Sequence, residues 1–158
     1  MRCRCPFDVC PKDAVGQFFV VQLDGSGVVD TGICVQVVAL ADRHTLMRQF
    51  GHNDQGTILR NASVEDCDAI NEILPQWEEC ALRECHQLIH FLHLPFTCVD
   101  AEYTLDGSVC RIFYALAPQS CTSIMPNVSR LQRELSFKLK CKVLLEQKTP
   151  GTGTDAVK

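Results

Sequence analysis

The chain reads VDAEYTLDGSVCRIFYAL at residues 99–116, and this stretch predicts a β-hairpin. Apolar and polar side chains alternate through residues 99–105, which is the period-two pattern of a strand with one buried face. Asp106 and Gly107 then supply the two positive-φ positions of a type I′ turn, which suits the right-handed twist of the flanking strands. Residues 109–116 are apolar on both faces, so we predict that this second strand is central in its sheet.

A two-residue turn would fix the register of this hairpin. The predicted cross-strand pairs on one face are Leu105–Ser108, Tyr103–Cys110, Ala101–Ile112 and Val99–Tyr114. On the other face Glu102 meets Arg111, an opposite-charge pair that supports the register by roughly a few tenths of a kcal/mol.

The chain has 158 residues and a net charge of −4 that is unevenly distributed. Residues 63–106 hold one basic and ten acidic residues, whereas residues 107–158 hold eight basic and three acidic ones. The length suits one domain or a small pair of domains. The overall acidity argues against strong non-specific nucleic-acid binding by the whole surface, but a local basic face stays open. No apolar run is long enough to span a bilayer, so we expect no membrane contact.

Eleven cysteines are scattered along the chain, and the N-terminus lacks the apolar segment of a secretory signal. We therefore interpret them as reduced thiols of a cytoplasmic protein, several acting as small core hydrophobes. Cys3, Cys5 and Cys10 suggest a zinc or iron–sulfur site, but their spacing lacks the usual C-x2-C pair and no fourth ligand is evident. We expect no metal and no cofactor, and interpret residues 1–15 as a flexible arm.

Residues 16–57 are expected to form a small N-terminal antiparallel β subdomain, because β-branched runs alternate with glycines. The expected strands are residues 16–24, 27–33 and 34–43, with one more at 46–50 and a loop at 51–56. A long helix then begins at the N-cap Ser63, is kinked near Pro75 and ends at about Leu92. Its predicted apolar face consists of Trp77, Ala81, Cys85, Leu88 and Leu92.

The hairpin is followed by an expected loop at residues 117–126 and a second helix from the N-cap Asn127 to about Lys140. The predicted inner stripe of that helix is Val128, Leu131, Leu135 and Leu139. Residues 142–147 are expected to form a closing strand, and residues 148–158 a flexible tail. The order from Ser63 onward is α-β-β-α-β, which predicts two helices on an antiparallel sheet and an α+β fold.

Catalytic motifs are absent, since the sequence has no G-x-S-x-G, no glycine-rich phosphate loop and no paired carboxylates in a suitable context. We therefore expect no enzymatic activity. The second helix instead carries a basic stripe, and the candidate RNA-binding residues are Arg130, Arg133, Phe137, Lys138, Lys140 and Lys142. A basic stripe with an exposed aromatic ring can hold phosphates and stack a base. A protein contact and a plain solvated face are the alternatives.

Three histidines, His86, His90 and His93, share one face of the long helix. Histidines at i and i+4 can chelate a metal, but no glutamate completes an H-E-x-x-H motif, so we prefer a polar face or a partner contact. The outer face of the hairpin, with Thr104, Val109 and Phe113, must be covered by the N-terminal strands or by a partner. The candidate partner-binding residues are therefore Val109, Phe113, His86, His90 and His93.

The hairpin motif also carries a resemblance to a known family. The segment VDAEYTLDGS followed by IFY resembles the hairpin of the polymerase-suppressor C-terminal domain, or PSP-type domain, found in bacterial YaaT/RicT-like proteins and in trypanosomatid proteins. Residues 58–63 with Asp66 resemble the family's entry into its long helix. Leu131, Leu135 and residues 142–146 resemble the helix and strand that follow. The resemblance covers residues 16–147 and is strongest over residues 58–147, where we expect the PSP-type domain.

Members of this family resemble assembly and regulatory proteins of RNA processing and mRNA regulation. The resemblance therefore implies a non-enzymatic protein- and RNA-interaction module, a subunit of a cytoplasmic hetero-oligomeric complex in post-transcriptional regulation. We expect the acidic long helix to dock protein and the basic face to contact RNA. Two alternatives stay open: a purely structural heterodimerising subunit without RNA contact, and a regulator that binds a metal or an iron–sulfur cluster. Bacterial members carry glycine-rich and cysteine-rich segments after the closing strand, which residues 148–158 lack, so no cluster ligands can be transferred.

Overall fold

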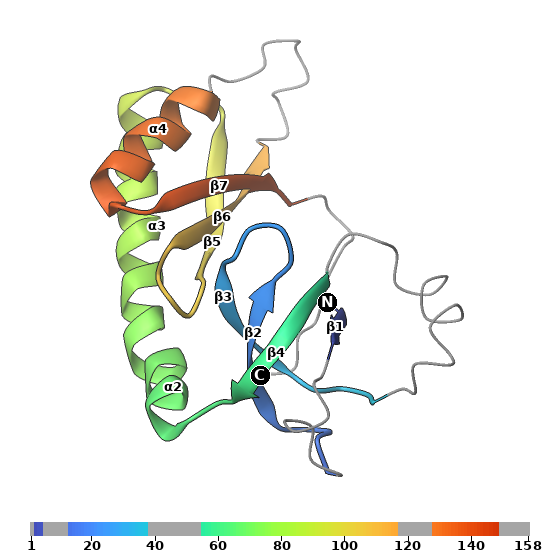
Figure 1. The fold of residues 1–158 in the computed structure, drawn as a ribbon. Coiled ribbons are helices and arrows are strands. Elements are labelled where there is room, and N and C mark those ends of the chain that lie inside the picture. Colours follow the sequence, from blue (N-terminus) through green and yellow to red (C-terminus); the bar gives the residue numbers. More distant parts are fainter. Residues whose placement is uncertain (1, 5–12, 38–54, 117–127, 149–158) are drawn as a thin grey trace. The chain divides into compact units, whose positions relative to one another are not determined.

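The computed structural model describes residues 2–4, 13–37, 55–116 and 128–148, whose helices and strands are drawn in Figure 1. These elements confirm the predicted α+β fold class. The chain divides into two compact units, one of residues 1–71 with 104–106, the other of residues 72–103 with 107–158. None of the helices in these described ranges is long and apolar enough to cross a membrane.

The first unit contains a four-stranded sheet. Its strands are β1 (Arg2–Arg4), β2 (Phe18–Leu23), β3 (Val29–Ile33) and β4 (Gln55–Asn61), in the spatial order β1-β4-β2-β3. β2 pairs antiparallel with both β3 and β4, as predicted for this region, whereas β1 pairs parallel with β4. The core of the unit is built on Ala14, Phe19 and Val21.

Two strands of this sheet differ from the expectation. β1 lies within residues 1–15, which we expected to be a flexible arm, and β4 includes the end of the expected loop at 51–56. Ile58 and Leu59 are adjacent apolar residues, so β4 lacks the alternation of apolar and polar residues by which a strand is predicted from sequence. Residues 34–37 are not in a strand, and the rest of the expected strands at 34–43 and 46–50 lies outside the described residues.

The long helical segment begins at its predicted N-cap. The Ser63 hydroxyl accepts a hydrogen bond from the Asp66 amide at 3.3 Å, and the Asp66 carboxylate accepts one from the Ser63 amide at 2.7 Å, which makes a capping box. The Arg60 guanidinium forms an ion pair with the same carboxylate. Hydrogen bonds from Arg60 and from the Ser63 amide hold the pKa of Asp66 far below its usual range.

Three helical pieces follow this cap without a loop between them. They are α2 (Val64–Asp68), the π-helical η2 (Ala69–Ile73) and α3 (Leu74–Phe91). Pro75 occupies the first turn of α3, where its missing N–H group is tolerated, and the predicted interruption near Leu74 is confirmed.

The apolar face of α3 is shifted from the predicted one. Ala81, Cys85 and Ile89 are buried against the sheet, but Trp77 is 47% exposed. The helix ends in a Schellman motif, because the amides of the two residues after its C-cap, His93 and Leu94, donate back to carbonyls of the last turn.

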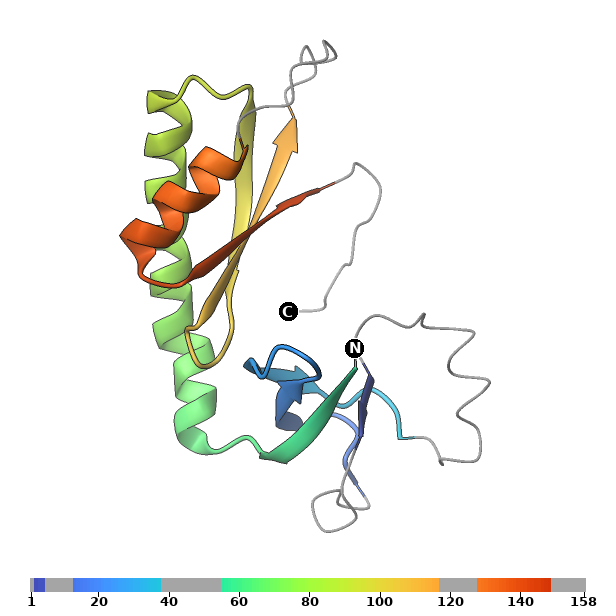
Figure 2. The same ribbon diagram turned by 45° about the horizontal axis from the view of Figure 1, so that its top comes forward.

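The second unit places two helices on one face of a three-stranded sheet, as Figure 2 shows. The strands are β5 (Phe96–Tyr103), β6 (Val109–Leu116) and β7 (Lys142–Gln147), in the order β5-β6-β7, so β6 is central as predicted. The helices are α3 and α4 (Val128–Leu139). The predicted Asn127 cap lies outside the described residues.

The closing strand β7 pairs parallel with β6, with Val143 beside Cys110. The sheet is therefore mixed, and the expected antiparallel arrangement is wrong for this strand. The connection from β6 to β7 contains α4, and a helix that crosses one face of the sheet allows the next strand to run parallel to the previous one. On the buried side of α4, Leu131 and Leu135 confirm the predicted inner stripe.

Side chains of α4 hold the outer edge of β7. The Gln132 side-chain amide donates a hydrogen bond to the Val143 carbonyl at 2.8 Å, and the Ser136 hydroxyl accepts one from the Val143 amide at 3.1 Å. These bonds occupy main-chain groups that an edge strand would otherwise present to another chain.

The hairpin has the predicted register near its turn and a different one further out. Tyr103 faces Cys110, Ala101 faces Ile112 and Glu102 faces Arg111, as predicted. The predicted pair of Val99 and Tyr114 is wrong, because a β-bulge between Cys98 and Asp100 places Cys98 opposite Tyr114.

The turn itself is not the predicted two-residue type I′. Residues 104–108 lie outside both strands, so the pair of Leu105 and Ser108 does not belong to the ladder, and Gly107 alone in this loop has a positive φ, of 67°. The Asp106 carboxylate instead accepts hydrogen bonds from the Thr104 hydroxyl at 2.7 Å and the Val29 amide at 3.2 Å. Asp106 therefore does not adopt the left-handed conformation that a type I′ turn requires, and its carboxylate is satisfied by these two hydrogen bonds instead.

Candidate nucleic-acid interface

The second helix presents a basic surface on the side opposite its buried leucines. We call this surface the α4 basic face, and it consists of Arg130, Arg133, Phe137 and Lys140. All four side chains are exposed, and Phe137 is 83% exposed. Because Leu131 and Leu135 are fully buried, the helical period directs residues 130, 133 and 137 away from the sheet. The structure thus brings three of the six candidate RNA-binding residues onto one side of α4. The fourth, Lys140, is exposed directly after the last residue of the helix, with a positive φ of 55°.

The other two candidates lie elsewhere. The Lys138 ammonium donates to the Glu84 carboxylate at 2.6 Å and so links α4 to α3. Lys142 is exposed at the start of β7, and its amide donates to the Ser108 carbonyl at 3.0 Å. Their assignment to an RNA contact stays a prediction, with Lys138 already engaged by an acidic partner.

The α4 basic face has the chemistry of a single-strand contact. Guanidinium groups can donate paired hydrogen bonds to phosphate oxygens, and an exposed phenyl ring offers a face on which a base can stack. Arg133 and Phe137 are one turn apart on the helix, so a phosphate contact and a stacking contact can be made by adjacent positions on one strand.

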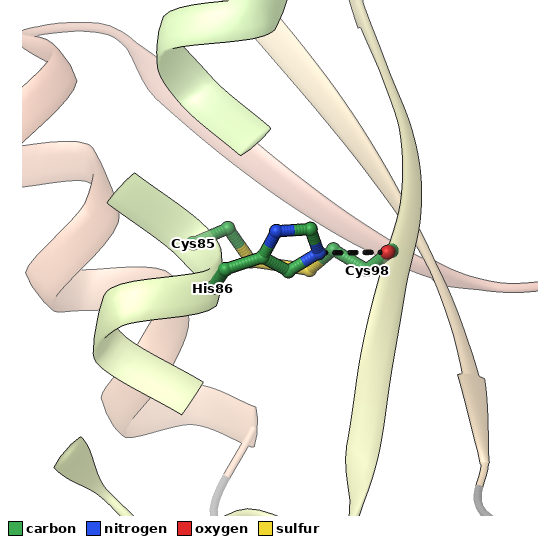
Figure 3. The surroundings of a disulfide bond; sticks show 3 residues. All are labelled: Cys85, His86 and Cys98. Carbon is green, nitrogen blue, oxygen red and sulfur yellow. Dashed lines mark hydrogen bonds between the residues drawn. A yellow bond between two sulfur atoms is a disulfide. The ribbon is translucent and has the colours of Figure 1, made fainter. Parts of the chain in front are cut away.

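Two of the candidate histidines, His86 and His90, lie on α3 beside a shallow depression, whereas His93 follows the end of the helix with a positive φ of 51°. The depression is lined by His86, Ile89, His90, His93, Leu94 and Thr97. The Nε2 atom of His86 lies 3.0 Å from the Cys98 carbonyl oxygen, as Figure 3 shows, so it acts as a donor to β5. The rings of His90 and His93 are 6.5 Å apart between centroids. Their role in partner binding stays a prediction.

Within the described parts of the chain, no group of three or more His, Cys, Asp or Glu side chains could hold a metal ion. Of the N-terminal cysteines only Cys3 is described; it lies on β1, and burial raises the pKa of its thiol. Cys5 and Cys10 lie outside the described residues.

The two hairpin candidates for partner binding are less exposed than the sequence suggested. Val109 is 6% exposed and Phe113 is half-buried. Thr104, on the same predicted face, is also buried. Whether the N-terminal strands or a partner cover this face stays a prediction, and a partner contact through Val109 would require that residue to become accessible.

Sequence reasoning missed two cysteine arrangements in the second unit. Cys85 of α3 and Cys98 of β5 form a disulfide next to His86, with their Cα atoms 6.8 Å apart (Figure 3), so the expectation of reduced thiols is wrong for this pair. Neither their separation of 13 residues nor their surroundings in the sequence signals a pairing, since both read as core positions.

The second arrangement groups Tyr103, Cys110 and Cys141, with the Cys141 sulfur 4.0 Å from the Tyr103 hydroxyl. Burial raises the pKa of Cys110 to about 12 and also raises that of Cys141. These two thiols are therefore protonated at neutral pH, and they lack the thiolate that a nucleophilic cysteine needs.

The elements that build the second unit, together with β4 and α2, correspond to a known conserved region. The model of the PSP1 C-terminal conserved region matches residues 56–147, more than half of the 158-residue chain. The chain belongs to the PSP1 family. The PSP1 region runs from β4 to the end of β7 and contains the whole α4 basic face. Comparison with curated proteins and with solved structures gives no match.

Proposed function

We propose that this PSP1 protein is a non-enzymatic protein- and RNA-interaction module that belongs to a cytoplasmic ribonucleoprotein or mRNA-regulatory complex. The observation that carries the proposal is the α4 basic face, where an almost fully exposed Phe137 stands among exposed cations opposite the buried leucines of α4. A phenyl ring in this position contributes little to the core and is available to a ligand.

The proposed ligand is single-stranded RNA. The chain is acidic overall, with a net charge of −4, so a general attraction to nucleic acid is weak and the contact must be local. Stacking of one base on Phe137 would contribute about 1–3 kcal/mol. Each phosphate that a cation of the α4 basic face neutralises would add about 0.7 to the slope of log K against log salt.

The test is the binding of a fluorescent oligouridylate at several salt concentrations. We expect Phe137→Ala to weaken binding about tenfold, which corresponds to about 1.4 kcal/mol. Arg133→Ala should lower the salt slope by about 0.7. Arg83→Ala is the matched control, because Arg83 is an exposed arginine on α3, with its side chain 63% exposed. If Arg83→Ala and Arg133→Ala reduce binding equally, the contact is not on the α4 basic face and the proposal is wrong.

The structural alternative, a subunit that assembles without RNA, has a distinct outcome in the same assay. It requires that no oligouridylate binds at low salt while the chain still associates with a protein subunit. The charge distribution supports the RNA proposal, because three of the eight basic residues after residue 106, Arg130, Arg133 and Lys140, belong to the α4 basic face.

A further inference from the structure

A second exposed surface lies on the long helix and shares no residue with the α4 basic face. We call it the α3 apolar stripe, and it consists of Ile73, Trp77 and Cys80. Ile73 is 45% exposed, Trp77 is 47% exposed and Cys80 is also exposed. The spacing of four and three residues places the three side chains in one row along the helix, about 10 Å long at 1.5 Å per residue.

Trp77 is held in place at the centre of this row. Its indole packs edge-to-face on the Tyr103 ring, with centroids 5.8 Å apart. It also lies against the hairpin loop, since a Cβ atom at Gly107 would be 2.9 Å from the indole ring. Half of the ring is thus fixed by packing and half faces outward, so little side-chain entropy would be lost when a partner covers it. Tryptophans in such positions are frequent binding hot spots.

The surroundings of the row are acidic. Residues 64–91 contain seven acidic residues and one arginine. Glu72 is exposed, and the Glu79 side chain is 79% exposed, with only a long 3.7 Å contact to Arg83. Each glutamate directly precedes a residue of the row, so its side chain lies about 100° around the helix from that residue. Two copies of this face would therefore repel each other, whereas a basic ligand would be attracted.

We propose that the α3 apolar stripe docks a basic amphipathic helix of a partner protein. Apolar side chains of that helix would pack on Ile73, Trp77 and Cys80, and its Lys or Arg side chains would face Glu72 and Glu79. The inference rests on the protein-binding half of the proposed function and names its surface and its partner class. It does not use the α4 basic face.

The test uses a synthetic helix of leucine and lysine as the probe, with binding to the intact chain measured by fluorescence anisotropy. Ile73→Glu removes part of the row and also makes the chain more acidic. Attraction by charge alone would therefore make this variant bind more tightly, whereas docking on the row makes it bind about tenfold more weakly. Gln87→Glu is the matched control, because it adds the same charge on an exposed position of α3 beyond the row, and should change binding by less than about twofold.

Three outcomes decide the proposal. Weaker binding by Ile73→Glu with an unchanged far-UV circular dichroism spectrum supports it. Equal or tighter binding by Ile73→Glu, or no binding by the wild-type chain, overturns it. Concentration-dependent self-association in light scattering that Ile73→Glu abolishes also overturns it, because the occupant would then be a second copy. Failure of RNA binding leaves all three readouts unaffected, so the two proposals fail separately.

Discussion

Substitution of Gly107 by alanine tests how the hairpin loop is fixed to α3. Gly107 has a φ of 67°, in the left-handed region, and an added Cβ would lie 2.9 Å from the Trp77 ring. That distance is shorter than any normal carbon–carbon contact, so the indole must move away from the loop.

Two contributions set the expected cost. A non-glycine residue in the left-handed region costs about 1–2 kcal/mol. Displacement of Trp77 weakens its edge-to-face contact with Tyr103, which is worth about 0.5–1.5 kcal/mol. We therefore expect Gly107→Ala to lower the free energy of unfolding by about 2–3 kcal/mol, and by only about 1–2 kcal/mol when Trp77 is already alanine.

Urea denaturation followed by far-UV circular dichroism measures both values, because Trp77 is the only tryptophan and cannot serve as the probe in every variant. The wild type, the two single variants and the double variant form a double-mutant cycle. A cost below about 0.5 kcal/mol for Gly107→Ala, or the same cost in both backgrounds, would refute the proposed contact between loop and indole.

Three further outcomes follow from the described contacts. Because the pKa of Asp66 is depressed in the folded state, its ionised form stabilises the fold above the unfolded pKa of about 3.9. This contribution to stability is lost as the pH falls through the lower folded pKa. In thermal denaturation at a series of pH values, Asp66→Asn should therefore lose less stability at acid pH than the wild type does. Joint replacement of Gln132 and Ser136 by alanine should expose the edge of β7 and increase self-association in analytical ultracentrifugation, whereas an unchanged monomer would contradict their shielding role. Peptide mapping without reductant should recover Cys85 linked to Cys98, and reduction should lower stability by up to about 3 kcal/mol; recovery of both as free thiols would contradict the pairing.

The parts of the fold that local patterns determine were predictable from the sequence. Ser63 followed by Asp66 is a local N-cap signal, and Pro75 restricts its own helix turn wherever it stands. The register of residues 101–103 with residues 110–112 is the predicted one, although the two-residue turn from which it was inferred is not the observed turn. The period of the α4 leucines placed the basic face correctly on the exposed side.

The parts that depend on distant contacts were not predictable. Aspartate before glycine favours a type I′ turn, but here the Asp106 carboxylate accepts a hydrogen bond from the Val29 amide, 77 residues away in sequence. The observed turn is therefore of a different type from the predicted one. The bulge near Val99 shifts the register without a glycine or other local signal. β7 pairs parallel with β6 because the connection through α4 crosses the sheet. The sequence of a strand alone does not indicate whether it pairs parallel or antiparallel, so this pairing could not be predicted.

Amide chemical-shift mapping of the isotopically labelled chain during titration with oligouridylate tests the RNA assignment most directly. The RNA assignment predicts the largest shift changes at residues 130–140, centred on Arg133 and Phe137, with small changes along α3. Shift changes centred on the histidine depression or on the α3 apolar stripe, or no changes at all at low salt, would contradict it.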